Sequence, residues 1–451
     1  MKFCLTLAAT VLLGGITLKA HAQAQQPWLA DRRYGEGIGV RVGNLELHPG
    51  IAGEVGYDSN YFLRAPTEVP LSAYRLRITP SITLATLGQQ RTGGPQPKVT
   101  FRAGAYVAYN ELIATDSKYK SEFADQRHLD VGSDLNLNIL PVGRVGADTN
   151  LAFIRQGQPS NNPDTQNAFD RDSFRAAAGV SWRPGGGLFD WRLGYEFLYN
   201  YFERSSFSYL NNFQNQVNMR GRWRFLPRTA LLYDGNYTWV TYPNPSTQND
   251  GTIARSRIGM NGLITNQLSL LAMVGWAGTF YKQGTNKTPE QFDSLTAQVE
   301  LKWYMSGSAE PMGPSSAPVG LSYASIGYLR DVSNSYLGNF YQKDRGYVGV
   351  SYLLGGTFVT NVTAGIANLA FPDSFYPSGN VQQPAFSQQR VDASVFGEYR
   401  LSNTFGLNAT FNYDRNFTDV EIPLSETDTS LPPDALAYER WQIFLGARWF
   451  L

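Results

Sequence analysis

The chain has 451 residues and a formal net charge of +1, from 38 Lys and Arg against 37 Asp and Glu. This balance lacks the basic excess that nucleic-acid binding requires, so no nucleic-acid partner is expected. Aromatic residues make up 14% of the chain and glycines number 44, while helical periods are few. The composition therefore indicates a β-protein whose apolar residues are thinly spread.

The chain begins with the pattern of a secretory signal. Lys2 precedes an apolar run over residues 5–18, and Ala20-His21-Ala22 supplies a small-residue cleavage site. Residues 1–22 are thus predicted to be a signal peptide. The single cysteine, Cys4, lies inside it, so neither a disulfide framework nor a lipoprotein is expected.

Residues 23–43 show no clean period and are predicted to form an N-terminal periplasmic segment. The spacing of Gly35, Gly37 and Gly39 resembles a nucleotide-binding glycine loop. A phosphate site of that kind also needs a strand before the glycines and a helix after them, and neither pattern is present.

Residues 44–451 repeat one unit of strand, long polar connection, returning strand and tight turn. Segments rich in Gly, Pro, Asn and Ser predict the turns at 140–143, 183–187, 226–228, 265–267, 355–356 and 402–404. Longer polar segments lie between them, at 156–171, 243–253, 283–292, 372–388 and 420–437. This alternation predicts an all-β fold, a transmembrane up-and-down antiparallel β-barrel of about 18 strands. Sixteen strands is the alternative, because the connections at 87–98 and 306–319 are longer than the other short ones.

The last stretch, YERWQIFLGARWFL, has the clearest period of two. Trp441, Leu445 and Trp449 fall on an apolar face, whereas Arg440 and Arg448 fall on the other face. The stretch resembles the closing strand of bacterial outer-membrane barrels, with Leu451 where a terminal Phe is usual. We expect the apolar face to contact lipid and the arginines to point inward.

Aromatic residues gather at both ends of the predicted strands. Returning strands reach their turns with Trp182, Trp223, Trp303, Tyr352, Tyr399 and Trp449. Outgoing strands end in the segments 199–202, 237–242, 280–281 and 411–417. Two aromatic belts at membrane interfaces would account for this pattern, which a soluble sandwich or barrel does not explain.

The stretch PGIAGEVGYDSNYFLRAP, followed by SAYRLRITPSI, resembles the opening hairpin of the β-barrel porin 2 family. The residues that carry the resemblance are Gly56, Tyr57, Asp58, Asn60 and Pro80, within about 35 residues. Members of that family are often associated with exopolysaccharide biosynthesis and export, which implies such a role here. Read from the residues alone, 58–60 is a good strand exit, because Asp and Asn bond to their own backbone in turns.

Charged residues recur in the phase opposite to the apolar face. An arginine facing lipid at mid-bilayer would cost ~2–4 kcal/mol, so these side chains should line the pore. They could pair with one another and stiffen the wall, or line a path for a polar or anionic solute. They are Arg75, Arg77, Arg192, Glu196, Arg220, Arg222, Arg224, Arg390, Asp392, Glu398, Arg400, Arg440 and Arg448.

Support for catalysis is slight. After the signal only His48 and His128 remain, on different strands, and there is no G-x-S-x-G. His128 shares a strand face with Asp130. No Cys/His set has zinc spacing, and Asp164, Asp170 and Asp172 suit a solvated loop better than a calcium site. We therefore expect no enzyme activity, no metal and no cofactor.

The sequence thus predicts a component of an exopolysaccharide secretion system in the outer membrane of a Gram-negative bacterium. It would hold or pass a polar glycan, anionic or neutral. The expected partners are outer-membrane lipid, the barrel-assembly machinery during insertion, polysaccharide-export proteins and the glycan. A passive diffusion porin for small polar solutes is the alternative.

Overall fold

The computed structural model describes most of the chain from residue 39 onward. The described residues are 39–87, 97–124, 126–157, 170–203, 205–244, 249–282, 291–305, 322–335, 337–355, 357–375, 380–423 and 434–451. The predicted signal peptide lies outside them, as does nearly all of the predicted periplasmic segment.

Eighteen long strands of 12–16 residues form the wall of the molecule. They are β2 (Leu45–Asp58), β3 (Ala73–Thr86), β4 (Val99–Ala114), β5 (His128–Ile139), β6 (Val145–Gln156), β7 (Arg171–Trp182), β8 (Phe189–Phe202), β9 (Asn212–Leu226), β10 (Thr229–Thr241), β11 (Gly251–Leu263), β12 (Leu268–Tyr281), β13 (Asp293–Tyr304), β14 (Tyr323–Asn334), β15 (Phe340–Leu354), β16 (Phe358–Phe371), β19 (Phe386–Arg400), β20 (Phe405–Phe417) and β23 (Tyr438–Phe450).

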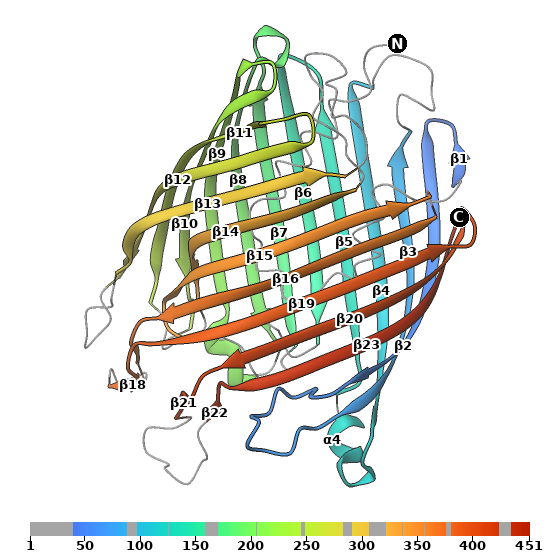
Figure 1. Ribbon diagram of the computed structural model, residues 1–451, viewed down its shortest axis with the longest axis vertical. Coiled ribbons are helices and arrows are strands. Elements are labelled where there is room, and N and C mark those ends of the chain that lie inside the picture. Colours follow the sequence, from blue (N-terminus) through green and yellow to red (C-terminus); the bar gives the residue numbers. More distant parts are fainter. Residues whose placement is uncertain are drawn as a thin grey trace.

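Every neighbouring pair in this wall is antiparallel, and the last strand pairs with the first. The register of β2 with β23 runs from Gly50↔Phe450 to Asp58↔Gln442. The wall is therefore a closed barrel, and the predicted 18-strand architecture is confirmed. Figure 1 shows the strands crossing the barrel at a steep tilt, as closure requires.

The two ends of the barrel differ, as the alternation of short and long connections predicted. Each predicted tight turn joins two consecutive strands, although residue 356 lies outside the described part. The predicted connections 87–98 and 306–319 lie largely or wholly outside the described residues. The strands that flank them, β3 with β4 and β13 with β14, are consecutive and pair in the wall, so the count of 18 stands. In the turn between β7 and β8, the glycines of η2 (Gly185–Gly187) all have positive φ, which other residues rarely adopt.

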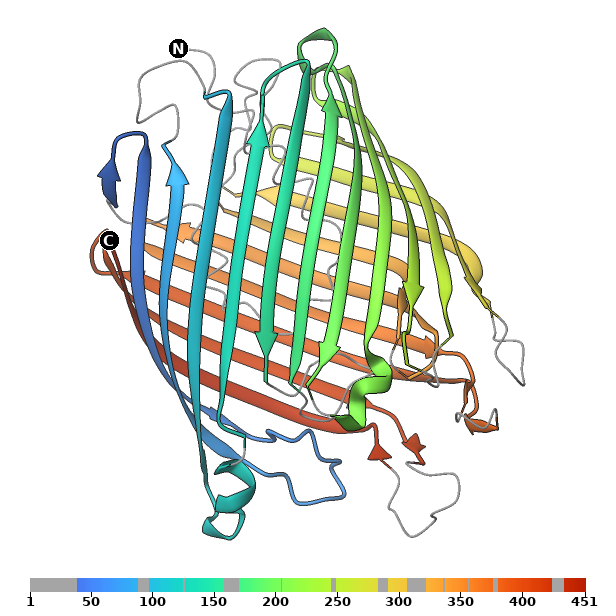
Figure 2. The same cartoon turned by 180° about the vertical axis from the view of Figure 1, so that it is seen from behind.

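The opposite, loop end carries small elements of its own (Figure 2). They are η1 (Ser117–Tyr119), α4 (Lys120–Ala124), η3 (Ser205–Leu210) and two short sheets, β17 (Ser374–Phe375) with β18 (Val381–Gln383) and β21 (Glu421–Ile422) with β22 (Asp434–Ala435). None of the helices in the described residues is long and apolar enough to cross a membrane.

A short strand, β1 (Val40–Val42), was not predicted within the segment 23–43. It pairs with Leu45–Leu47 of β2 after a tight turn in which Gly43 has φ +62°. β23 covers this edge of β2 only from Gly50 onward. β1 thus covers the part of the β2 edge that β23 leaves exposed.

Alternation along each strand separates an inner from an outer wall. On β23, Trp441, Leu445 and Trp449 are exposed outside, whereas Arg440 and Arg448 are each 1% exposed inside. The predicted turn-end aromatics are all exposed on the outer wall. At the loop end the belt is partial: Phe202 and Tyr281 point inward and are buried, because the period of two sends alternate aromatics to the inner wall.

Candidate functional site on the inner wall

The inner wall is the candidate site because charged and amide side chains gather there. Strand alternation and register place all of the predicted pore residues on this wall: Arg75, Arg77, Arg192, Glu196, Arg220, Arg222, Arg224, Arg390, Asp392, Glu398, Arg400, Arg440 and Arg448. They do not form one site. Most belong to separate ion-pair clusters, each of which ties two or more strands together.

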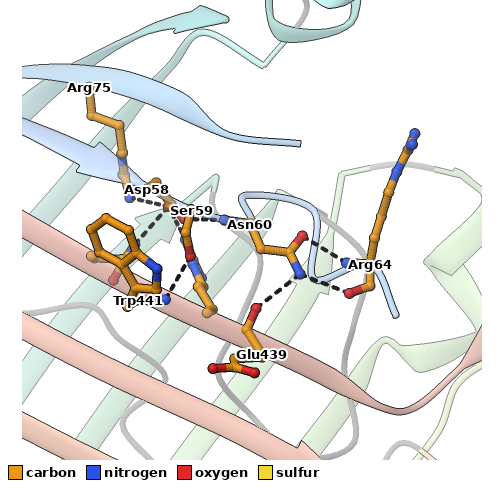
Figure 3. Close-up of polar contacts among 9 residues, drawn as sticks. Asp58, Ser59, Asn60, Arg64, Arg75, Glu439 and Trp441 are labelled. Atoms are coloured by element: carbon orange, nitrogen blue, oxygen red, sulfur yellow. Dashed lines mark hydrogen bonds and ion pairs between the residues drawn. The ribbon is translucent and has the colours of Figure 1, made fainter. Parts of the chain in front are cut away.

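The seam cluster joins the first barrel strands to the last. Asp58 is fully buried, and its carboxylate accepts hydrogen bonds from Arg440 and from Gln442, the latter at 2.7 Å. Arg75 of β3 donates a longer one, at 3.4 Å (Figure 3). The two guanidiniums outweigh the one carboxylate, so these three buried groups together carry an excess of positive charge.

A second pair lies one row further toward the turn end. The Nε atom of Arg77 donates to Glu54 at 2.9 Å, and both residues are buried. The ring of Phe444 lies between the two arginines of this wall, 5.4 Å from the guanidinium of Arg75 and 5.0 Å from that of Arg77. A cation over an aromatic face is stabilised there, so Phe444 helps to hold the arginines in place.

The residues of the family resemblance build the loop-end exit of β2. β2 ends at Asp58, and the side chain of Asn60 donates to the carbonyls of Arg64 at 2.8 Å and Glu439 at 3.1 Å. Asn60 Oδ1 in turn accepts from the backbone N–H of Arg64 (Figure 3). This amide fixes the turn to β23, which supports the strand-exit interpretation.

The remaining motif residues serve the packing of the seam. Gly56 lies so close to Phe444 that an added Cβ would come within 2.2 Å of its ring. Tyr57 is on the outer wall, with its ring 4.9 Å from that of Trp441. Pro80 pairs with Ile51 of β2, but the register of β3 with β4 lapses at Thr79 and Pro80, because proline has no N–H for the ladder.

Two further clusters tie β15, β19, β20 and β23 together. Arg390 donates two hydrogen bonds to Asp414, which also accepts from the Tyr438 hydroxyl at 3.1 Å. Nearby, Asp392 accepts from Arg345 of β15. Toward the turn end, the fully buried Glu398 accepts from Arg400 at 3.0 Å and from Arg448. These arginines are therefore held by carboxylates of the wall.

The arginines of β8 and β9 are less completely neutralised. Arg192 bonds to Asp148, and Glu196 pairs with Arg175. Arg220 lies 3.7 Å from Asp234, which is closer to Arg257 at 2.7 Å. Asp190 forms ion pairs with Arg222 at 3.3 Å and with Arg183 at 3.6 Å. Its carboxylate also attracts the guanidinium of Arg224. Among the described residues of this part of the turn end, Arg183, Arg222 and Arg224 thus share the carboxylate of Asp190.

An amide track runs along β8 and β9 toward the loop end. Asn212 accepts from Asn200 at 3.1 Å and from Gln214 at 3.0 Å, and Gln216 and Asn218 continue the same inner face. This track was not predicted. Its signal is present in NFQNQVNMR, where polar residues recur at every second position.

The tip of the β14–β15 hairpin was also missed. We use hairpin tip for the described residues of 331–343. β13 pairs with β14 only as far as Ala297↔Arg330, whereas β14 pairs with β15 as far as Asn334↔Phe340. The hairpin tip therefore stands away from β13.

The hairpin tip lies against inner-wall residues of β11 and β12. Val332 and Phe340 pack in a buried cluster with Ile253, Ala277 and Tyr281, which alternate with the outward residues of those strands. Two strands separate β11 from β14 in the wall, and neighbouring strands are ~4.8 Å apart. The tip reaches β11 across the inner side of the barrel, which narrows the loop end. Its connecting loop is too short to stand out in the sequence as an infolded loop.

The two histidines lie near main-chain oxygens, one distant and one close in the sequence. His48 Nδ1 lies 3.0 Å from the carbonyl oxygen of Leu451, and His128 Nδ1 lies 2.7 Å from that of Gln126. His128 Nε2 is 3.5 Å from Asp130. Asp164 lies outside the described part, and Asp170 and Asp172 are inside it. The described residues contain no group of three or more His, Cys, Asp or Glu suited to a metal ion.

Comparison with known proteins finds similar solved structures. The iron transporter FrpB from Neisseria meningitidis (F3-3 variant) is 8% identical with a TM-score of 0.47, over 90% of this chain and 81% of that one. Pseudomonas aeruginosa OpdL is 9% identical with a TM-score of 0.44, over 91% and 99%. Acinetobacter baumannii OccAB4 is 9% identical with a TM-score of 0.43, over 90% and 98%.

These similarities are low, so the barrel fold rests on its own strand register. No family model matches the sequence, and no curated protein matches it. The resemblance of the β2–β3 hairpin to the β-barrel porin 2 family stays a prediction.

Proposed function

We propose that the chain is a barrel of the outer membrane of a Gram-negative bacterium, with its outer wall in contact with lipid. Strands of 12–16 residues exceed the ~9–11 that a tilted strand needs to cross a bilayer. The outer wall is apolar, with exposed aromatics near the turn end and a second, partial belt near the loop end. Amphipathic rings favour membrane interfaces, which supports this placement.

Within that membrane we propose a non-enzymatic component of an exopolysaccharide secretion system that holds or passes a polar glycan. The observation that carries the proposal is the amide track, in which Gln214 and Gln216 are partly exposed on the inner wall. Asn200, Asn212 and Asn218 are buried beside them, and the arginines of β9 follow toward the turn end. Amides offer both donors and acceptors, which suit sugar hydroxyls. Arginines at the turn end favour any anionic group on the glycan. The resemblance of the opening hairpin adds the link to polysaccharide export.

A passive diffusion porin is the second candidate. The infolded hairpin tip favours it, because a constricted mouth suits small solutes better than a chain of sugars. An 18-strand barrel is otherwise wide enough to leave an aqueous interior.

Deletion of the gene tests the proposal when it is followed by assays of surface polysaccharide and of small-solute uptake. Loss of polysaccharide with normal uptake is expected. Complementation with the double variant Gln214→Leu, Gln216→Leu should restore less polysaccharide than complementation with Val217→Leu, a change on the outer wall of the same strand. Normal polysaccharide with impaired uptake would overturn the secretion role in favour of the porin.

A further inference from the structure

Lys343 on the inner wall of β15 lacks the ion pair that its register offers. Its cross-strand neighbour on β14 is Asp331, and its neighbour on β16 is Leu369. Leu369 is apolar and buried, so it cannot pair with an ammonium group. Asp331 would ordinarily serve as the partner, because directly opposed residues on neighbouring strands are within reach of each other.

The hairpin tip takes Asp331 away from this pairing. One carboxylate oxygen of Asp331 is 2.8 Å from Nη2 of Arg255, and the other is 3.9 Å from Arg257. Both arginines belong to β11, on the far side of the infolded tip. The ion pair between Asp331 and Arg255, which holds the tip across the mouth, therefore leaves Lys343 without this carboxylate as a partner.

The other charged groups around Lys343 form ion pairs with one another or with other residues. Its charged neighbours are Arg345, Arg390, Asp392 and Asp331. Asp392 accepts from Arg345, and Arg390 binds Asp414. Across the described residues, Lys343 has no carboxylate within 4.0 Å, and it is only partly exposed.

We propose that Lys343 binds the carboxylate of an acidic sugar in the transported glycan. A partly desolvated ammonium without a counter-charge gains more from an incoming anion than a paired cation does, because no existing bond must break. Lysine presents a compact charge with three donors, which suits a single carboxylate. This inference rests on the proposed glycan function and names the chemical class of the glycan.

Binding of two trisaccharides of similar size to the purified full-length barrel in detergent tests the site. Trigalacturonate carries a carboxylate on every sugar, and maltotriose carries none. The wild type should bind trigalacturonate more tightly than maltotriose, and added salt should reduce this difference in affinity. Lys343→Gln should weaken trigalacturonate binding roughly tenfold, since a charge-assisted bond to a partly buried group is lost, and should leave maltotriose unaffected. Lys343→Arg keeps the charge and should retain most of the affinity.

Lys302 provides the matched control. It is also a lysine of the inner wall, but its ammonium lies 3.3 Å from Glu300. Lys302→Gln should change trigalacturonate binding less than twofold. Equal losses in the two glutamine variants would indicate a diffuse positive potential and overturn the site, as would a wild type without preference for trigalacturonate. The secretion role is decided separately, by surface polysaccharide in the deletion strain.

Discussion

Arg440 and Asp58 are separated by 382 positions in the sequence and share two hydrogen bonds across the seam that closes the barrel. Both are buried, at 1% and 0% exposure. Gln442 and Arg75 bond to the same carboxylate, so three strands meet at one charge. The seam is thus held by a buried ionic contact in addition to the backbone ladder.

Asp58→Ala should destabilise the folded barrel strongly. It leaves Arg440 and Arg75 buried without their carboxylate, and breaking a buried pair in this way costs about 3–5 kcal/mol. Equilibrium urea unfolding in detergent, followed by tryptophan fluorescence, measures the change. Glu439→Gln is the control, because the Glu439 carboxylate is exposed on the outer wall, where it lies 3.3 Å from the exposed Arg415 and accepts from the Tyr413 hydroxyl at 3.3 Å. It should cost less than about 1 kcal/mol. Equal losses of unfolding free energy in the two variants would show that burial of the seam ion pair does not increase its contribution to stability.

Accessibility should alternate along β9. A cysteine at Gln216 faces the interior and one at Val217 faces outward, since strand neighbours point to opposite walls. In intact membranes, a membrane-impermeant maleimide should label the first and spare the second. Both should react after solubilisation in urea. Labelling of position 217 alone in membranes would show that the barrel is turned inside out relative to this register.

Low pH should weaken the contact between Glu203 and Arg155 at the loop end. The hydrogen bond from Arg155 lowers the pKa of Glu203 below its ordinary 4.5. Because the folded pKa is depressed, the contribution is complete above pH 4.5 and is lost as the pH falls through the folded pKa. Both side chains are about one-third exposed, so the pair is worth at most about 1 kcal/mol. The unfolding free energies of wild type and Glu203→Gln should differ at pH 7 and converge as the pH falls through the folded pKa, and a constant difference would contradict the assignment.

Much of the fold was predictable because it depends on local patterns. The period of two predicted which side chains face the inner and the outer wall. Turn residues such as those at 183–187 and 402–404 predicted where the strands end. Tight turns tolerate few residue types, so their sequence signal is strong. The inward position of the arginines followed from the cost of charge in lipid.

The partners of those arginines were not predictable. Arg440 finds Asp58 only when the barrel closes, and Asp331 turns from Lys343 to Arg255 only because the hairpin tip bends inward. Such choices depend on contacts between distant strands, which a single sequence does not display. β1 was missed for a related reason: its three residues are too short to show a period.

The infolded hairpin tip can be tested with a disulfide. Asn249 and Asn339 exchange hydrogen bonds, from the backbone N–H of Asn249 to Asn339 Oδ1 at 2.9 Å and from Asn339 Nδ2 to Asn249 Oδ1 at 3.1 Å. The bond from the backbone N–H of Asn249 to the Asn339 side chain brings the two backbones close, as a disulfide needs, since it spans a Cα separation of ~4.4–6.8 Å. The double variant Asn249→Cys, Asn339→Cys should therefore cross-link on mild oxidation, which mass spectrometry of tryptic peptides would detect.

The only natural cysteine is Cys4, in the predicted signal, so mature protein would add no competing thiol. Asn249→Cys with Gln216→Cys is the control pair, because Gln216 lies within β9 and not on the hairpin tip. In a planar bilayer, cross-linked and wild-type channels should have equal conductance, since the bond fixes a position that the tip already occupies. Reduction should then leave the conductance unchanged. Two free thiols after oxidation, or a conductance that falls on cross-linking, would show that the tip does not rest across the mouth.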